Sequence, residues 1–325
     1  MRVAVLGAGD FAVPVLDAVL ASHHPLAGVV SRPDRPHGRH HRKAPSPAAA
    51  WATRNQCPLL TPPRVSDPGF EEPFRRLGAD VAVVVDFGEI LRPFVFEWTA
   101  CGFFGVHPSL LPRWRGAAPI PWTILSGDRV AGVSVFRLSA SVDTGNLAFR
   151  GEVTLDDRDT STTLGKRLGR AGAAALLDVV DRLEGGNLTE VSQPAEGATV
   201  ARKLERRDGF LRWEFDARRL DAAVRALAPW PCAWFTVGGR DVKVLRSVPL
   251  DVSHAAAPGT VLGWGTPPGE SEGVRIACGS GELVLLELQS TGRRPLPAPE
   301  WLRGARLSPG DVLSSSMTED GGGPP

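Results

Sequence analysis

The sequence of 325 residues contains few cysteines and no cluster of them. The four, at positions 57, 101, 232 and 278, form no CxxC pair and no Cys/His group with the spacing of a zinc site. We therefore expect reduced, mostly buried thiols and no structural metal.

Long apolar runs and an excess of one charge are also missing. No stretch reaches the roughly eighteen apolar residues of a membrane span, and the start, MRVAVLGAGDF, is typical of a strand and not of a signal peptide. The 37 Lys and Arg nearly balance the 36 Asp and Glu, so the net charge of +1 gives no general affinity for nucleic acid. We expect a cytoplasmic protein with no membrane partner, in which any basic surface is local.

Apolar residues are abundant, at 42% of the chain, which is enough for two domains of ordinary size. In the first half, short apolar runs alternate with amphipathic stretches. We predict strands near 2–7, 26–31, 80–87, 102–109 and 132–139, and helices near 11–22, 70–78 and 160–186. Strictly alternating strands and helices favour an α/β fold with a Rossmann-like, doubly wound parallel sheet.

The second half differs from the first in composition and in the pattern of its apolar runs. A polar stretch follows the long helix, and beyond it short strands are interrupted by Gly and Pro, which is typical of a small OB-like β-barrel. We predict a first domain at 1–187, a linker at 188–208, a C-terminal barrel at 209–313 and a disordered tail at 314–325.

Two segments of the first half invite a binding hypothesis. The string GAGDFA, at 7–12, matches GxGxxA, but Ser31 and Arg32 stand where a dinucleotide site needs an acidic residue, so we favour a tight strand-to-helix turn. The loop at 31–47 is rich in Arg, Lys and His. By charge alone it is either a flexible basic loop or lid or a grip on phosphates, and its histidines form a weak pattern for a metal.

His107 and Asp143 are the candidates for acid/base chemistry. Each follows a predicted strand, so in a parallel sheet both would lie at the same edge. A carboxylate beside an imidazole suits a general acid or base, although an ordinary structural histidine and a turn-forming Asp fit equally well. Ser109 lies in no nucleophile-elbow pattern, and Leu110, Leu111 and Pro112 suit the wall of a pocket for a flat heterocycle.

The string HPSLLPRWRGAAPI, at 107–120, resembles the signature of the formyltransferases that use 10-formyltetrahydrofolate. Other strings resemble the same family in the same order, and together they span about residues 1–313: DFAVPVL, PDRPHGRHHRKAPSP, VDTGNL, APWPCAWF, PGTVLG and LLELQSTGRRPLPAPEWLRGARLSPG. So many collinear matches are far more specific than one motif.

This resemblance implies a formyltransferase domain followed by a barrel that helps to hold tRNA, in a monomer. The implied reaction moves a formyl group from the co-substrate 10-formyltetrahydrofolate to the amino group of methionine on initiator methionyl-tRNA, without a metal. By match to the family, the catalytic residues are His107 and Asp143, the folate-binding residues are Ser109, Leu110, Leu111 and Pro112, and the tRNA-binding residues of the basic loop are Arg35, Arg39, Arg42 and Lys43.

The chain departs from the family at three places. Gly105 stands where the family has a catalytic asparagine, Ala8-Gly9 replaces a proline-rich turn, and Phe87 replaces a tyrosine. We expect a gap beside Gly105 that water fills or that Asn146 reaches, and an impaired rate. Two alternatives stay open: a silent homologue that binds folate or tRNA, and an N-formyltransferase of a small amine such as an amino sugar or amino acid.

Overall fold

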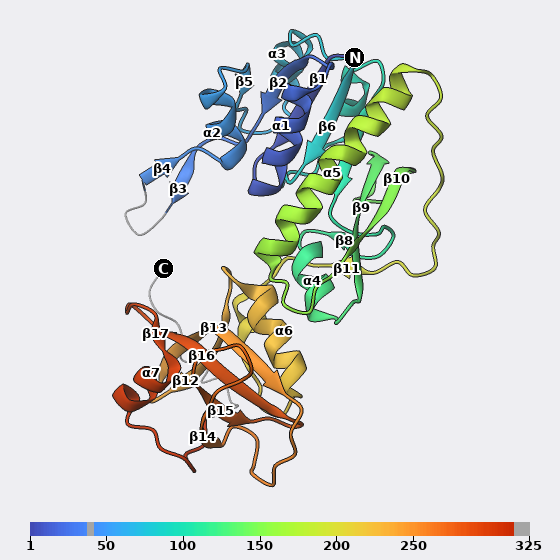
Figure 1. Cartoon of the computed structure of the whole chain (residues 1–325). Helices are drawn as coiled ribbons and strands as arrows, with labels where there is room; N and C mark the ends of the chain where they lie inside the picture. The colour runs from blue at the N-terminus through green and yellow to red at the C-terminus, as the bar shows by residue number, and fades with distance from the viewer. Residues whose placement is uncertain (38–41, 315–325) are drawn as a thin grey trace. The chain divides into compact units, whose positions relative to one another are not determined.

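The structure is a computed structural model that describes residues 1–37 and 42–314, with the backbone alone at 35–37 and 42–43 (Figure 1). The chain divides into two compact units. Unit 1 comprises Met1–Ile120, Arg129–Asp156 and Thr163–Arg202, and unit 2 comprises Pro121–Asp128, Asp157–Thr162 and Lys203–Pro325. Among the described residues, no helix combines the length and the apolar character that crossing a membrane requires.

Unit 1 is built on a seven-stranded sheet in the order β10-β9-β7-β6-β1-β2-β5. Its strands are β1 (Val3–Gly7), β2 (Leu26–Val30), β5 (Leu59–Leu60), β6 (Val81–Val85), β7 (Phe103–His107), β9 (Val130–Arg137) and β10 (Leu147–Thr154). The strands from β7 to β5 pair in parallel, which confirms the predicted Rossmann-like α/β sheet. β9 runs antiparallel to β7, and β10 antiparallel to β9, an edge arrangement common in doubly wound folds.

Both faces of this sheet are covered. α1 (Val13–Ala21) and α5 (Ser161–Glu184) lie on one face (Figure 1). Gly172 of α5 lets the helix approach closely, because a Cβ there would lie 2.8 Å from Cγ1 of Val106 on β7. On the alternate side of β7, Phe103 packs into an aromatic cluster with Phe74 and Trp98. This cluster is contributed by α3 (Glu71–Arg75) and the short 3-10 helix η3 (Pro93–Trp98).

The basic loop forms a hairpin of two short strands, β3 (Arg35–His37) and β4 (Arg42–Ala44), before α2 (Pro47–Arg54). The helix begins after Ser46, whose hydroxyl accepts a hydrogen bond from Ala49 N at 3.1 Å. Farther along, α4 (Pro119–Leu125) precedes β9, and β11 (Val200–Ala201) pairs in parallel with β8 (Arg115–Gly116). The predicted linker is therefore tied to unit 1 by a short strand.

Unit 2 contains an antiparallel sheet in the order β12-β13-β16-β15-β14, with β17 beside β16. Its strands are β12 (Ala233–Val237), β13 (Arg240–Leu250), β14 (Val261–Gly265), β15 (Gly273–Ala277), β16 (Glu282–Ser290) and β17 (Leu296–Pro297). Gly238 and Gly239, both with positive φ, make the tight turn of the predicted β12–β13 hairpin. α6 (Ala217–Leu227) and α7 (Ala298–Ala305) complete a core around Trp213, Phe235 and Trp301.

The last described residues close this sheet. Ser314 bridges to Thr236 on β12, and Val312 bridges to Thr260 beside β14, so one segment joins the two edge strands. The C-terminal antiparallel barrel is thereby confirmed. Of the predicted tail, residues 315–325 lie outside the described part of the chain.

Candidate active site

The segment that follows β7 is held by two buried serine hydroxyls. Ser134 on β9 donates to the carbonyl of Ser109 at 2.7 Å and accepts from Leu111 N at 3.1 Å. Ser109 in turn donates its hydroxyl to the carbonyl of Arg113 at 2.6 Å, and the peptide bond between Leu111 and Pro112 is cis. These bonds fix the path of the chain between His107 and β8.

His107 is buried at the end of β7, with both ring nitrogens facing polar atoms. Its Nε2 lies 2.8 Å from the carbonyl of Trp114, which can only accept, so Nε2 carries the proton. The lone pair of the neutral ring is then on Nδ1, which lies 3.7 Å from Oδ2 of Asp143. That distance is too long for a hydrogen bond but suits an ion pair once Nδ1 is protonated.

Asp143 reaches this position by an unexpected route. We expected it at the carboxyl end of a parallel strand, which was wrong because β9 is antiparallel and ends near the start of β7. The loop 138–146 turns back instead, with Asp143 at φ 53° and its Oδ2 accepting from Gly116 N at 2.8 Å. Gln193 fixes the loop by donating to the carbonyls of Asp143 and Gly145, at 2.9 and 2.8 Å. The structure therefore does bring His107 and Asp143 together.

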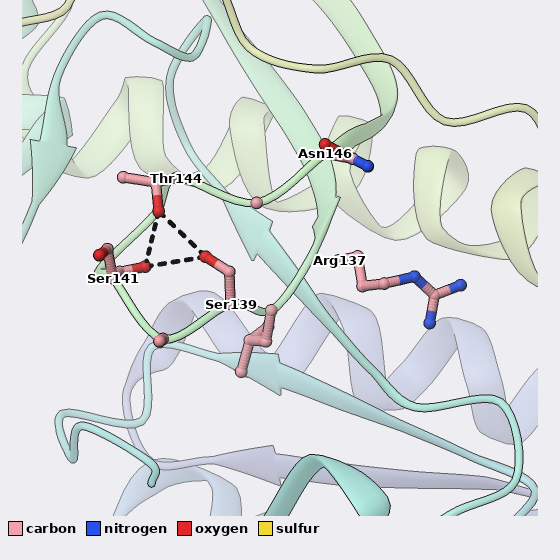
Figure 2. Close-up of a pocket in the computed structure, with 8 residues that line it drawn as sticks. Arg137, Ser139, Ser141, Thr144 and Asn146 are labelled. Atoms are coloured by element: carbon pink, nitrogen blue, oxygen red, sulfur yellow. Dashed lines mark hydrogen bonds between the residues drawn. The ribbon is translucent and has the colours of Figure 1, made fainter. Parts of the chain in front are cut away.

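The same loop lines an open pocket of about 420 Å³ (Figure 2). Its lining residues are Arg137, Leu138, Ser139, Ala140, Ser141, Thr144, Gly145 and Asn146. The hydroxyls of Ser139 and Thr144 lie 3.0 Å apart, and both donate to the carbonyl of Ser141. Figure 2 shows Arg137 and Asn146 extending away from this group. A small ligand in the pocket would meet hydroxyl and backbone groups of the loop that also carries Asp143, although neither His107 nor Asp143 lines the pocket.

The expected gap beside Gly105 does not exist. A Cβ on Gly105 would lie 2.4 and 2.6 Å from Cε1 and Cζ of Phe136, because the phenyl ring of β9 occupies that space. Asn146, the other candidate to fill it, is exposed and accepts a hydrogen bond from Ser192 at 3.3 Å. An aromatic ring therefore stands where we expected water, since a glycine in a packed sheet lets a neighbouring side chain move in.

Comparison with known proteins identifies the family of this chain. Residues 1–180 match the model of the family described as formyl transferase, and residues 203–306 match that of the formyl transferase C-terminal domain. The chain belongs to the formyltransferase family. It is 41% identical over 307 residues to a methionyl-tRNA formyltransferase of Paracoccus denitrificans, covering 94% of this chain and 98% of that protein. A protein of the same name from Streptomyces coelicolor is 37% identical, over 96% of this chain and 99% of the relative.

Solved formyltransferase-like structures share the fold of this enzyme at low identity. HypX from Aquifex aeolicus, solved with tetrahydrofolic acid, superposes with a TM-score of 0.65 at 15% identity, covering 97% of this chain and half of the other. An N-formyltransferase from Helicobacter canadensis, solved with folinic acid and dTDP-3-aminofucose, gives a TM-score of 0.64 at 14% identity, covering 89% of this chain and 99% of the other. At such identities the likeness concerns the fold alone.

The four residues predicted to bind folate in this formyltransferase lie in the turn after β7. Ser109, Leu111 and Pro112 are buried, and Leu110 is partly exposed. Leu110 packs against β9, where a Cβ on Gly132 would lie 2.3 Å from its Cδ2. Their folate contacts stay a prediction, and their observed role is to shape the turn that carries His107.

Three of the four residues predicted to bind tRNA lie on the strands β3 and β4. These are Arg35, Arg42 and Lys43, with Arg35 opposite Ala44 and Lys43 opposite Pro36. Arg39 lies outside the described residues, as do the side chains of the other three. The backbone thus brings Arg35, Arg42 and Lys43 onto two paired strands, and the role of all four residues in binding stays a prediction.

Asp86, which no sequence pattern singled out, lies where β6 ends. Burial among surrounding protein raises the pKa of its carboxyl to about 6, although a hydrogen bond from Phe11 N and the charge of Arg32 lower it. Part of this residue remains accessible to solvent, while the carboxyl itself is packed over Gly9, where a Cβ would be 1.8 Å from Oδ2 of Asp86. The sequence did hold one signal for Asp86, namely the replacement of the family's proline-rich turn by Ala8-Gly9. A residue with a Cβ at position 9 would displace this carboxylate.

Proposed function

We propose that this enzyme transfers the formyl group of 10-formyltetrahydrofolate to the amino group of methionine on initiator methionyl-tRNA. The observation that carries the proposal is the near full-length similarity to relatives named methionyl-tRNA formyltransferase, at 37–41% identity. The His107–Asp143 pair beside an open pocket supports it, because formyl transfer needs a base next to a small-molecule site.

The neutral ring of His107 is arranged to act as a base through Nδ1. The amino group of the acceptor attacks the formyl carbon, and His107 takes the proton that this amine loses. The new imidazolium faces Asp143 and is stabilised by the carboxylate, while the Trp114 carbonyl holds Nε2 in place. The bond between the formyl carbon and N10 of the folate then breaks, and His107 returns the proton to N10, so charge and protons balance.

The pocket of loop 138–146 suits the folate co-substrate in size and chemistry. Its volume of about 420 Å³ lies in the range of small-molecule sites. The hydroxyls of Ser139 and Thr144 offer hydrogen bonds at its wall. We assign this pocket to the ring end of the folate, which brings the formyl group toward Asp143.

One observation favours a second candidate function, that of a silent, catalytically inactive homologue that binds folate or tRNA but does not transfer the formyl group. The ring of Phe136 fills the space beside Gly105, where the family resemblance calls for an asparagine. A phenyl ring has no N–H or O–H to stabilise the oxyanion, and the loss of one such donor costs about a hundred- to thousandfold in rate.

Purified protein with 10-formyltetrahydrofolate and charged initiator tRNA tests both candidates. We expect formyl-methionyl-tRNA to form, and the His107→Ala variant to lose at least about a hundredfold in rate while it still binds tRNA. Activity that survives His107→Ala would overturn the mechanism. Binding of tRNA without transfer would favour the silent homologue, and transfer to a dTDP-amino sugar or a free amino acid alone would overturn the tRNA acceptor.

A further inference from the structure

A second cluster of ionisable side chains lies at the opposite end of β1 from His107, where β1 begins. Asp181 and Glu184 occupy one face of the last turn of α5, and His23 and His24 form the turn between α1 and β2. One ligand atom from each of the four lies within 4.8 Å of the other three. The formyl-transfer mechanism uses none of them.

The imidazole of His24 is fully buried, and both of its nitrogens face the cluster. Nε2 lies 2.9 Å from Oδ1 of Asp181, while Nδ1 lies 3.1 Å from the amino group of Met1. The ring of His23 lies against this ring at a tilt of 43°, with centroids 4.0 Å apart, and its Nε2 lies 3.2 Å from the same Oδ1 of Asp181. The two histidines thus converge on one carboxylate oxygen.

The charges of this cluster are unbalanced without a further cation. Two carboxylates at a helix C-terminus are disfavoured by the helix dipole, and neutral imidazoles leave them a charge of −2. The amino group of Met1 contacts Oε1 of Glu184 and supplies one positive charge. Oε2 of Glu184 faces His23 instead, 3.7 Å from Nε2. With the Met1 amine counted and both imidazoles neutral, as metal binding requires, the cluster keeps a net charge of −1, which attracts a cation to that side.

We propose that His23, His24, Asp181 and Glu184 form a binding site for a zinc-like divalent metal ion. A tetrahedral zinc ion with bonds of about 2.0–2.1 Å separates its ligand atoms by about 3.3 Å. Three of the separations among the facing nitrogens and oxygens, 2.9, 3.2 and 3.7 Å, bracket that value, and the others lie within 4.8 Å, so the exposed side chains of His23 and Glu184 would close around the ion. Two imidazoles with two carboxylates match zinc or cobalt, whereas magnesium and calcium prefer oxygen ligands alone.

A metal ion in this site would cross-link two segments that are distant in sequence. His23 and Asp181 are separated by most of unit 1, and the metal would tie the α1–β2 turn to the end of α5. Binding to the folded state alone raises the melting temperature with metal concentration. With Nε2 of His24 on the metal, its ring proton moves to Nδ1, so the Met1 ammonium, which can only donate, must turn away from this nitrogen.

The test uses the full-length protein after treatment with a chelator. Cobalt(II) is titrated in and the absorption of four-coordinate cobalt is followed, with zinc calorimetry and melting curves in parallel. We expect one tight equivalent in the wild type, and at least tenfold weaker binding in His23→Ala and Asp181→Asn. The matched control, Asp178→Asn, removes an exposed carboxylate one turn earlier on α5, where it pairs with Arg182, and should bind as the wild type does.

Other histidines of the chain offer competing sites, so the variants decide the outcome. His23 is 67% exposed and Asp181→Asn keeps its size, so both variants should fold, and melting in chelator checks this. Equal zinc affinity and stoichiometry in the wild type and in both variants would overturn the proposal. A wild type that binds no tight equivalent would overturn it as well.

Discussion

At the scale of single residues, the shape of the site depends on which side chain fills the space beside each of two glycines. Gly105 and Phe136 are coupled, because a Cβ on the glycine and the phenyl ring cannot coexist. Gly9 and Asp86 are coupled in the same way, in the segments that follow the neighbouring strands β1 and β6. A substitution that adds a Cβ at either glycine therefore requires a change in its partner as well.

Restoring the family's asparagine by Gly105→Asn alone is not expected to raise the rate of formyl transfer. The new side chain collides with Phe136 and should lower the free energy of unfolding by about 1–3 kcal/mol, as overpacking does. Combined with Phe136→Ala, the asparagine gains space and should raise the formylation rate by up to about a hundred- to thousandfold. Single-turnover rates and urea unfolding of both single variants and the double variant measure this. A rate gain in the single variant Gly105→Asn would contradict the packing argument.

Asp86→Asn should change how stability depends on pH. The pKa of Asp86 is raised from 3.8 to about 6 by burial, so the folded state holds this proton more tightly than the unfolded state. Stability of the wild type should therefore fall, relative to Asp86→Asn, as the pH rises from about 4 to about 6, and the difference should then stay constant. Urea unfolding between pH 4 and 8 checks this, with Glu97→Gln at an exposed carboxyl as the control. Parallel curves for Asp86→Asn and the wild type would refute it.

At the scale of elements, the active site depends on how the turn after β7 is fastened to β9. Ser134 makes two hydrogen bonds to the backbone of this turn, at Ser109 and Leu111. Because both are buried, Ser134→Ala leaves an unsatisfied donor and acceptor in the turn. We expect a loss of about 1–3 kcal/mol in unfolding free energy and faster hydrogen exchange at the Leu111 amide. Ser126→Ala, which removes an exposed hydroxyl bonded to the Trp122 carbonyl, serves as control and should change neither.

The β3–β4 hairpin carries the prediction about tRNA. Replacing Arg39, Arg42 and Lys43 by alanine should weaken tRNA binding and reduce the slope of log affinity against log salt by about 0.7–0.9 for each phosphate that is no longer neutralised. Folate binding should not change. A triple alanine variant at exposed Arg54, Arg64 and Arg129 controls for net charge. The idea fails if both triple variants show the same salt dependence as the wild type.

At the scale of the whole molecule, the sequence correctly predicted those strands and turns that depend on residues close together in the chain. Continuous apolar runs identified the parallel strands, and the Gly238-Gly239 turn identified a hairpin, because both signals lie within a few residues. Three features were out of reach: the reversed direction of β9, the ring of Phe136 beside Gly105, and the meeting of His23 with Asp181. Each depends on contacts between distant segments, which no local pattern encodes. The resemblance located His107 and Asp143, but the role of Trp114 in fixing the ring required coordinates.

The segment at Val312 and Ser314, which joins β12 to β14, covers two sheet edges that could otherwise pair with other copies of this protein. Val312 and Ser314 pair with residues beside both edge strands, so a chain cut after Pro309 would leave two rows of backbone donors and acceptors unpaired. Open edges of this kind recruit strands from other molecules. In such a truncated chain we expect concentration-dependent association, visible by sedimentation, and mixing it with intact protein invites exchange of the missing strand between copies. Association of the truncated chain but not of the intact protein would show that Val312 and Ser314 shield these edges from other copies.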